Sequence, residues 1–236
     1  MNTFLFENLS VFLPTYNEGK NIENVVLNIK EVLQKVASNW EILIINDGSA
    51  DNTLTIAKRL AQGDNKIKVI NHGKNMGYGA SLKSGLYGAK YSWIAFIDSD
   101  GQFDFSEIVN FADTQKNTNA DIIIGYYKSR KVSLSKIITS KLWEYVVFFL
   151  FGLKVRDIDC GFKLISKKVL DKIPKLESER GAFISSELLI KATKAGFKIV
   201  EIPVSHFPRK FGKGTGRDLN VIIQSFKDLF KLYGKN

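Results

Sequence analysis

The sequence contains a single cysteine, Cys160, among its 236 residues. A disulfide within the chain needs two cysteines, so a disulfide-stabilised scaffold is excluded and a reducing compartment is favoured. Long apolar runs are also missing. The longest one, YVVFFLFGL at residues 145–153, is well short of the roughly 18–20 residues that a membrane-spanning helix needs. The first residues lack both a basic start and a long apolar core, so we expect no signal peptide.

Linkers and internal repeats are absent from the sequence as well. The four prolines are scattered, and no stretch is of low complexity or rich in Pro, Gly or Ser. A chain of this length fits one large domain, or one domain with a small appendage. We therefore expect a single domain over residues 1–216, followed by a basic amphipathic helix over residues 217–236.

Acidic residues are scarce in the second half of the chain. Residues 1–125 carry 11 Lys and Arg against 14 Asp and Glu, whereas residues 126–236 carry 23 against 10. The basic half accounts for the overall formal net charge of +10. This asymmetry indicates a polyanionic partner, which would be nucleic acid, an anionic membrane surface or phosphate groups.

The hydrophobic pattern predicts an α/β fold. In the first half, strands expected at residues 10–16, 40–49, 67–73 and 93–100 alternate with helices expected at residues 21–36, 51–61 and 79–90. In the second half, we expect strands at residues 120–127 and 197–207, a turn followed by a strand within residues 157–166, and helices at residues 133–152, 184–196 and 217–235. This alternation predicts a mostly parallel central sheet with helices on both faces. In such sheets, ligands bind beyond the carboxyl ends of the strands.

One of these strand ends carries two carboxylates. The run WIAFI is followed by Asp98 and Asp100, which would point to the same side if the strand continued through them. Two neighbouring carboxylates repel each other unless a cation lies between them, and Mg²⁺ or Mn²⁺ prefers such oxygen ligands. Gln102 offers a further oxygen. The alternative is an ordinary turn, because Asp, Ser and Gly are turn formers.

Polar residues and glycines also follow the other strands of the first half. The segment PTYNEGKNI is a candidate to face a nucleotide, although Asn17 or Asn21 also suits the capping of a helix. Asp47 is placed to bond a base or ribose, and the glycines of NMGYGA allow the backbone to approach a ligand. Neither a P-loop nor a complete dinucleotide-binding glycine motif is present.

These four strand ends, PTYNE, NDGSAD, NMGYGA and DSDGQ, resemble in order the motifs of the family 2 glycosyltransferases, which have the GT-A fold. Downstream, RDIDCGFKLIS, SSELLIKATKAG and IPVSHFPRKFGKGTG are similar to the branch that glycosylates polyprenyl phosphates, such as the dolichol-phosphate mannose synthases. The resemblance covers residues 10–216. The chain departs from the family where a serine is often found two residues after Gly212, because Gly214 and then Thr215 stand there.

The resemblance implies a role for each matching residue. The nucleotide sugar would contact Pro14, Tyr16, Glu18, Asp47, Gly77, Asp98, Ser99 and Asp100. The metal ion, Mg²⁺ or Mn²⁺, would be bound by Asp98, Asp100 and Gln102. The catalytic residues would be Asp157, Asp159, Arg209 and Lys213, and the acceptor would contact Arg130, Lys163 and Glu187.

The implied reaction is an inverting transfer of a sugar from GDP-mannose or a UDP-hexose to a polyprenyl phosphate, either dolichyl or undecaprenyl. The enzyme would act as a peripheral protein on the cytoplasmic face of a membrane, docked by the segments at 141–154 and 217–235; the alternative is that these segments pack on the sheet. The alternative acceptor is a sugar hydroxyl of a soluble or cell-surface glycan, for which Asp157 or Asp159 would be the base.

Three other functions fit the sequence less well. A nucleotidyltransferase would carry a Gly-rich, Arg-containing loop after the first strand, where this chain has the acidic and polar PTYNEGKN. A processive polysaccharide synthase would carry a Q-x-x-R-W motif and several membrane-spanning helices. A nucleic-acid-binding module would leave the acidic strand ends unexplained, because they would repel the phosphate backbone. We therefore expect no nucleic-acid partner.

Overall fold

The computed structural model describes residues 4–128, 134–179, 181, 183–211 and 219–234. The strands are β1 (Phe6–Thr15), β2 (Ala37–Asp47), β3 (Ile67–His72), β4 (Trp93–Ile97), β5 (Ile122–Tyr127), β6 (Phe162–Ser166) and β7 (Ile199–Val204). The α-helices are α1 (Ile22–Val36), α2 (Thr53–Gly63), α3 (Tyr78–Gly88), α4 (Ile108–Thr118), α5 (Leu134–Phe151), α6 (Lys167–Lys172), α7 (Phe183–Lys194) and α8 (Leu219–Tyr233), and a short 3₁₀ helix, η1, spans Phe105–Glu107.

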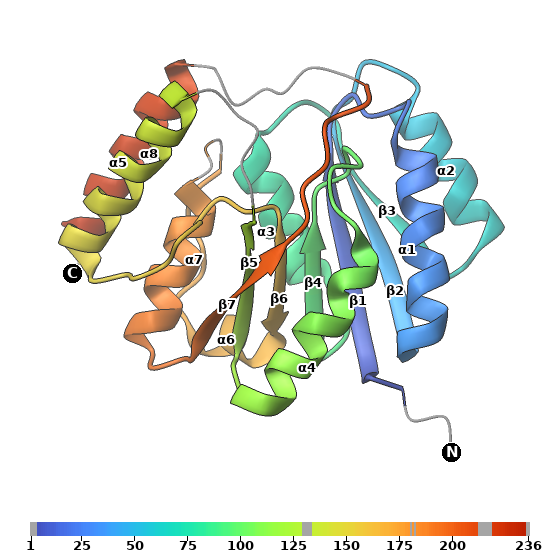
Figure 1. Ribbon diagram of the computed structural model, residues 1–236. Coiled ribbons are helices and arrows are strands. Elements are labelled where there is room, and N and C mark those ends of the chain that lie inside the picture. The colour runs from blue at the N-terminus through green and yellow to red at the C-terminus, as the bar shows by residue number, and fades with distance from the viewer. Residues whose placement is uncertain (1–3, 129–133, 180, 182, 212–218, 235–236) are drawn as a thin grey trace.

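The strands form one sheet in the order β3-β2-β1-β4-β6-β5-β7. β1 runs parallel to β2 and β4, and β2 runs parallel to β3. β6 is antiparallel to both of its neighbours, β4 and β5, and β5 is parallel to β7. The predicted α/β fold with a mostly parallel sheet is thus confirmed. The order places the carboxyl ends of β1, β2, β3 and β4 at one edge, which is the upper edge in Figure 1.

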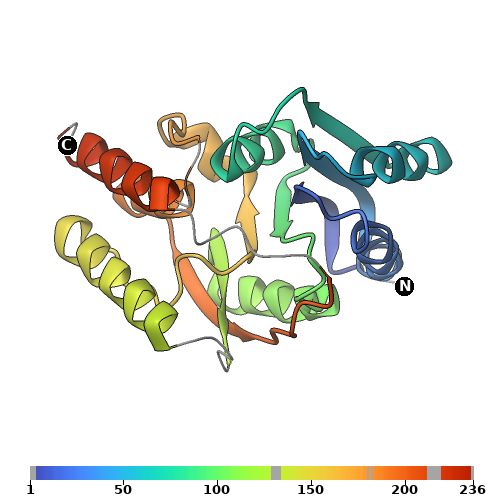
Figure 2. The same ribbon diagram turned by 90° about the horizontal axis from the view of Figure 1, so that it is seen from above.

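Helices cover both faces of the sheet, with α1 and α4 on one face and α3 and α7 on the other (Figure 1 and Figure 2). The central strands are therefore apolar on both sides: the consecutive residues Val11, Phe12 and Leu13 of β1 are all fully buried. Helix α1 buries one stripe only, formed by Ile22, Val26, Ile29, Leu33 and Val36. The core lies in these two layers between sheet and helices.

Helices α5 and α8 lie side by side beyond the β5–β7 end of the sheet (Figure 1 and Figure 2). The ring of Trp143 in α5 packs edge-on against Phe226 in α8, with 5.3 Å between centroids, and Phe151 packs likewise against Tyr233 at 5.9 Å. Leu229 of α8 is fully buried, so this helix packs on the domain. Within the described residues, no helix is both long enough and apolar enough to cross a membrane.

Three short elements were not predicted from the sequence: η1, α4 and α6. The sequence of α4, IVNFADTQKNT, is rich in Asn, Asp and Thr, which are poor helix formers in isolation. Tertiary packing compensates, because Ile108, Phe111 and Ala112 are buried along one side of the helix. The helix ends at Asn119, which adopts a left-handed conformation with a φ of 53°.

Candidate active site

The acidic pair lies in a tight turn that directly follows β4. The strand ends at Ile97, and Gly101 has a positive φ of 73°. The expectation that the strand continues through Asp98 and Asp100 is therefore wrong, and strand alternation does not orient the pair. The turn is fixed instead by its hydrogen bonds: the amide of Gln102 donates to Asp100 Oδ1 at 3.0 Å, and the Ser99 hydroxyl donates to the carbonyl of Pro14 at 2.7 Å.

The guanidinium group of Arg209 lies between two of the predicted acidic residues. Its Nη1 donates to Oε1 of Glu18 and its Nη2 donates to Oδ2 of Asp100, both at 2.7 Å. Glu18 and Asp100 are both buried, so these ion pairs are shielded from water. The structure thus joins the end of β1, the end of β4 and the segment after β7 through one side chain.

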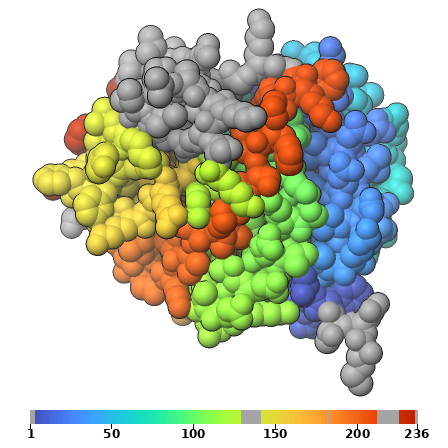
Figure 3. Space-filling model, viewed as in Figure 1, coloured from blue at the N-terminus to red at the C-terminus, as the bar shows by residue number. Residues whose placement is uncertain are grey.

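Residues 205–211, which we call the crossing segment, carry Arg209 over the carboxyl edge of the sheet. The amide of Phe207 donates to the carbonyl of Gln102, and the side-chain amide of Gln102 donates to the carbonyl of Phe207, both at 2.8 Å. Asn21 at the start of α1 donates to the carbonyl of Phe211 at 3.4 Å. Figure 3 shows the crossing segment in orange-red at the surface, against the blue N-terminal part. It is therefore anchored at several points above the acidic turn.

Asp98 lies deeper than Asp100 in the same turn. Its Oδ1 accepts a hydrogen bond of 3.3 Å from the hydroxyl of Tyr78. Its other oxygen packs against Gly161, where an added Cβ would lie only 2.0 Å away. Burial, together with the negative charge of Asp100, raises the pKa of Asp98 to about 7. The two carboxylates therefore repel each other, which is the electrostatic condition under which a cation binds.

The oxygen atoms of this turn fit a hard divalent cation that takes other ligands from its substrate. Among the described residues, no three His, Cys, Asp or Glu side chains gather into a metal cage. Mg²⁺ and Mn²⁺ commonly use one or two carboxylates together with water and phosphate oxygens, so Asp98 and Asp100 would be enough protein ligands, with Asp100 sharing oxygens that already accept from Gln102 and Arg209. The side-chain N–H of Gln102 donates to the crossing segment. Its side-chain oxygen is therefore the atom of Gln102 that suits a cation.

A second cluster of charged residues lies in and after the turn before β6. Asp157 is buried, Asp159 is exposed, and Lys163 of β6 is almost completely buried. The Nζ of Lys163 donates to the carbonyl of Cys160 and lies 5.3 Å from the centre of the Phe96 ring. Burial lowers the pKa of Lys163, and the negative charges of Asp159, Asp157 and Asp98 oppose that shift. Lys163 is thus an internal counter-charge beneath the acidic residues.

Cys160 is fully buried, and burial raises the pKa of its thiol to about 12. A thiol that stays protonated at neutral pH is a poor nucleophile. Cys160 therefore packs as a small side chain in the core.

Two residues that were predicted to contact a ligand, Asp47 and Glu187, already make hydrogen bonds within the protein. Both carboxylate oxygens of Asp47 accept backbone N–H groups, from Met76 and from Gly77, each at 2.9 Å. Glu187 lies on α7, where its oxygens accept the amides of Glu177 and Ser178 at 2.8 and 2.9 Å and a 2.6 Å bond from Lys191. These contacts stabilise loops, and a ligand contact at either carboxylate would have to share an oxygen.

The remaining predicted residues divide by exposure. Pro14 is buried under the turn, whereas the ring of Tyr16 is partly exposed at the carboxyl edge. Arg130 and Lys213 lie outside the described residues. Tyr78, which contacts Asp98, was missed by the sequence reasoning, although its motif NMGYGA was singled out. The sequence feature that could have identified Tyr78 is an aromatic residue that immediately follows a glycine at a strand-to-helix junction.

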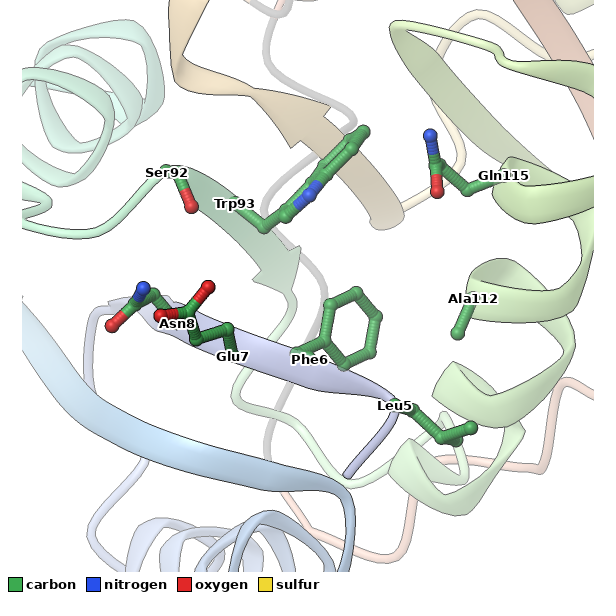
Figure 4. A pocket seen from close by; sticks show the side chains of 8 residues that line it. All are labelled: Leu5, Phe6, Glu7, Asn8, Ser92, Trp93, Ala112 and Gln115. Atoms are coloured by element: carbon green, nitrogen blue, oxygen red, sulfur yellow. The ribbon is translucent and has the colours of Figure 1, made fainter. Parts of the chain in front are cut away.

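One cavity among the described residues lies away from this site. It has a volume of about 150 Å³ and is bounded by the N-terminal ends of β1 and β4 and by α4 (Figure 4). Its lining includes Phe6, Asn8, Trp93 and Gln115. Because it opens at the amino edge of the parallel strands, it is not the crevice in which sheets of this kind bind their ligands.

The chain is similar to known glycosyltransferases. Residues 10–174 match the model of glycosyl transferase family 2. The chain is 29% identical over 222 residues to a dolichyl-phosphate beta-glucosyltransferase of Saccharomyces cerevisiae, covering 84% of this chain and 66% of that protein. It is 25% identical over 227 residues to a dodecaprenyl-phosphate galacturonate synthase of Rhizobium johnstonii, covering 94% and 66%.

A third relative, glycosyltransferase AglD of Haloferax volcanii, is 27% identical over 207 residues, which make up 85% of this chain but only 33% of AglD. The chain therefore spans a third to two thirds of the length of these relatives.

Among solved structures, glucosyl-3-phosphoglycerate synthase of Mycobacterium tuberculosis, in complex with Mn²⁺, UDP and glucosyl-3-phosphoglycerate, aligns with a TM-score of 0.69 at 20% identity. The alignment covers 97% of this chain and 79% of that one, and it supports the same fold. The family match extends over well more than half of the chain and includes the strand ends that meet at the acidic turn. The chain belongs to glycosyl transferase family 2.

Proposed function

We propose that this chain transfers a sugar, with inversion, from a nucleotide sugar to a polyprenyl phosphate. The observation that carries the proposal is the cluster of Asp98, Asp100, Glu18 and Arg209 at the carboxyl edge of the sheet. It combines acidic oxygens suited to a metal ion with a guanidinium suited to phosphate oxygens. That combination matches the diphosphate of a sugar donor. The names of the yeast and Rhizobium relatives both contain a polyprenyl phosphate, and this supports the choice of acceptor.

In the proposed reaction, an oxygen of the lipid phosphate attacks the anomeric carbon of the donor. The bond from that carbon to the diphosphate breaks, and the electron pair leaves with the nucleoside diphosphate. Asp98 and Asp100 would hold the metal ion, which supplies charge stabilisation for the leaving phosphates. Arg209 donates charge-assisted hydrogen bonds and is already positioned by Glu18 and Asp100.

The acceptor chemistry follows from its charge. A phosphate monoester is anionic at neutral pH, so it attacks without a strong general base. A sugar hydroxyl would need one, and Asp159, which is exposed in the turn before β6, is the accessible carboxylate there. The nucleotide, the sugar and the lipid length are left to experiment, since the relatives named for glucose and for galacturonate differ in their sugar.

The direct test incubates the purified chain with UDP-hexoses or GDP-mannose, Mg²⁺ or Mn²⁺, and either undecaprenyl or dolichyl phosphate. We expect labelled sugar to enter the organic phase on extraction, and to do so with one nucleotide in clear preference. The same nucleoside diphosphate should give the largest metal-dependent rise in Tm, because ligand that binds only the folded state stabilises it. Transfer to a soluble glycan, with none to the lipid phosphates, would replace this proposal by the hydroxyl-acceptor alternative.

We propose further that α5 and α8 dock the enzyme on an anionic membrane surface. Exposed apolar side chains gather on these paired helices, and Phe149 is 87% exposed. Basic residues border them: Lys154 lies 5.8 Å from the ring of Phe148, and Lys194 lies 5.6 Å from the ring of Phe151. The exposed members on the two helices are Leu142, Tyr145, Phe148, Phe149, Phe226, Phe230 and Tyr233. Aromatic rings flanked by lysines are typical of interfacial helices.

Replacement of Phe148 and Phe149 by Ser is therefore expected to release the protein from membranes. The wild type should sediment with liposomes that contain anionic lipid and dissociate at high salt, since each surface lysine contributes about 1 kcal/mol. The double variant should bind weakly and should transfer sugar more slowly to a long-chain lipid phosphate than to a short soluble analogue. The measurement is co-sedimentation together with transfer to both acceptors.

Leu27, an exposed apolar residue on α1, supplies the matched control. Leu27→Ser removes apolar surface away from α5 and α8 and should leave sedimentation unchanged. Wild-type protein that stays in the supernatant at low salt would refute the docking proposal and favour a soluble acceptor.

A further inference from the structure

A hydrogen-bonded chain of three side chains connects β2, β3 and α3 beside the proposed active site. Strands β2 and β3 are in parallel register, with Asp47 opposite His72 at their carboxyl ends. The Nδ1 of His72 lies 2.7 Å from Asp47 Oδ1, and its Nε2 lies 2.8 Å from the hydroxyl oxygen of Ser84. An ionised carboxylate only accepts, so Nδ1–H donates to Asp47, and in the neutral ring Nε2 accepts the Ser84 hydroxyl proton.

The arrangement has the order of a Ser-His-Asp triad, but its surroundings do not suit nucleophilic catalysis. Ser84 lies in the interior of α3, where backbone N–H groups are used by the helix itself. A serine nucleophile needs free N–H groups nearby to stabilise an oxyanion. The side chains of His72 and Asp47 are also only 9% and 5% exposed. The chain of hydrogen bonds therefore acts by holding its members in place.

What it holds is the loop between β3 and α3. Besides His72, Asp47 accepts the amides of Met76 and Gly77. Gly77 has a φ of 100°, a conformation that favours glycine. The next residue, Gly48, approaches the loop backbone so closely that an added Cβ would lie 2.3 Å from the carbonyl carbon of Lys74. Residues 74–77 are thus fixed by the Asp47 carboxylate and by the close contact with Gly48.

This loop lies where the nucleoside part of the donor would extend. The diphosphate is assigned to the turn after β4, and we place the reacting sugar on the side of β6, because Asp157 and Asp159, which the family resemblance implies to be catalytic, lie before that strand. In the order β3-β2-β1-β4-β6, the nucleoside then points toward β1 and β2, whose neighbour β3 carries the loop. The residue after the loop, Tyr78, donates to Asp98, so a displaced loop would also disturb the metal-binding turn.

We infer that His72 is a positioning residue for donor binding: it orients Asp47, and Asp47 in turn fixes the backbone of residues 74–77 against the nucleoside. The inference rests on the proposed function. Because His72 touches neither the diphosphate nor the reacting carbon, it contributes to binding of donor and transition state alike. Its loss should therefore raise KM much more than it lowers kcat.

The test compares substitutions that keep or remove single contacts of the ring. His72→Ala loses both contacts, whereas His72→Asn places an amide N–H near the position of Nδ1 and keeps the bond to Asp47. Ser84→Ala removes only the far contact, and Ser92→Ala, an exposed serine before β4, is the matched control. Binding of UDP and GDP with Mg²⁺ is measured by calorimetry, donor kcat and KM by transfer, and protection of the Met76 and Gly77 amides by hydrogen exchange.

We expect His72→Ala to raise Kd and donor KM about tenfold, with kcat changed by no more than about twofold. His72→Asn should recover most of the affinity, Ser84→Ala should fall between, and Ser92→Ala should match the wild type. The amides of Met76 and Gly77 should exchange faster in His72→Ala even without nucleotide.

Two results would overturn the inference: unchanged exchange at these amides, or equal loss of affinity in the Ala and Asn variants. A different result would separate the two proposals. If the wild type binds neither UDP nor GDP while the Met76 and Gly77 amides still exchange faster in His72→Ala, the proposed function is refuted but the role of His72 in holding the loop is not.

Discussion

Asp100→Ala is expected to abolish sugar transfer, with a loss of about a thousandfold or more. Asp100 supplies one of the two carboxylates proposed to hold the metal, and metal stabilisation of a leaving group is worth several kcal/mol. The same side chain anchors Arg209, so the variant also loosens the group that is proposed to bind the diphosphate. Calorimetry with the nucleoside diphosphate, in the presence of Mg²⁺ or of a chelator, should show that the metal-dependent part of binding is gone.

A neighbouring acidic residue provides the control for this experiment. Asp104 is exposed and caps η1 through a 2.9 Å bond from the amide of Ser106. Asp104→Ala removes a negative charge close to the turn without touching the proposed site, and it should retain activity. Unchanged turnover in chelator, or in Asp100→Ala itself, would remove the metal from the mechanism. A circular dichroism spectrum like that of the wild type establishes that the variant is folded.

Arg209→Ala is expected to lower turnover by about 10²- to 10³-fold, the range found when one charge-stabilising donor is removed from an active site. In the proposed reaction its guanidinium acts on phosphate oxygens, whose charge grows as the glycosidic bond breaks. Binding of the free nucleoside, which has no phosphates, should change far less. Transfer rates and nucleoside affinity, measured side by side, separate these two effects.

Two variants sharpen this prediction. Arg209→Lys keeps the charge but cannot bridge Glu18 and Asp100 with a planar fork, so it should recover only part of the turnover. Lys210→Ala removes the adjacent exposed cation and should behave as the wild type. Equal losses of nucleoside binding and turnover in Arg209→Ala would mean that Arg209 only helps to assemble the site.

Much of the fold followed from local patterns in the sequence. Buried strands of a parallel sheet are apolar on both faces, so runs such as WEILII and WIAFI identify them directly. Helix α4 was not predicted, because its sequence favours a helix only when the segment packs on the sheet. The α/β fold and the family resemblance are confirmed, whereas the roles given to individual site residues and the domain boundary at residue 216 stay predictions.

The candidate site was predictable in its parts but not in its contacts. The sequence singled out Glu18, Asp100 and Arg209. It did not reveal that the guanidinium of Arg209 contacts both carboxylates. It placed Lys163 and Glu187 near the acceptor, yet in the structure both are buried. Burial and partners are properties of packing between elements, so no local spacing reveals them.

The sequence by itself determined which strands end in polar residues, and hence the edge of the sheet at which the candidate site lies. Only the tertiary structure decided which basic side chain contacts Asp100 and Glu18. Arg209 reaches Asp100 across 109 residues of chain and Glu18 across 191. Such contacts depend on the order of strands in the sheet and on the path of the crossing segment. The alternation of side chains along a strand acts over a few residues and carries no information about either.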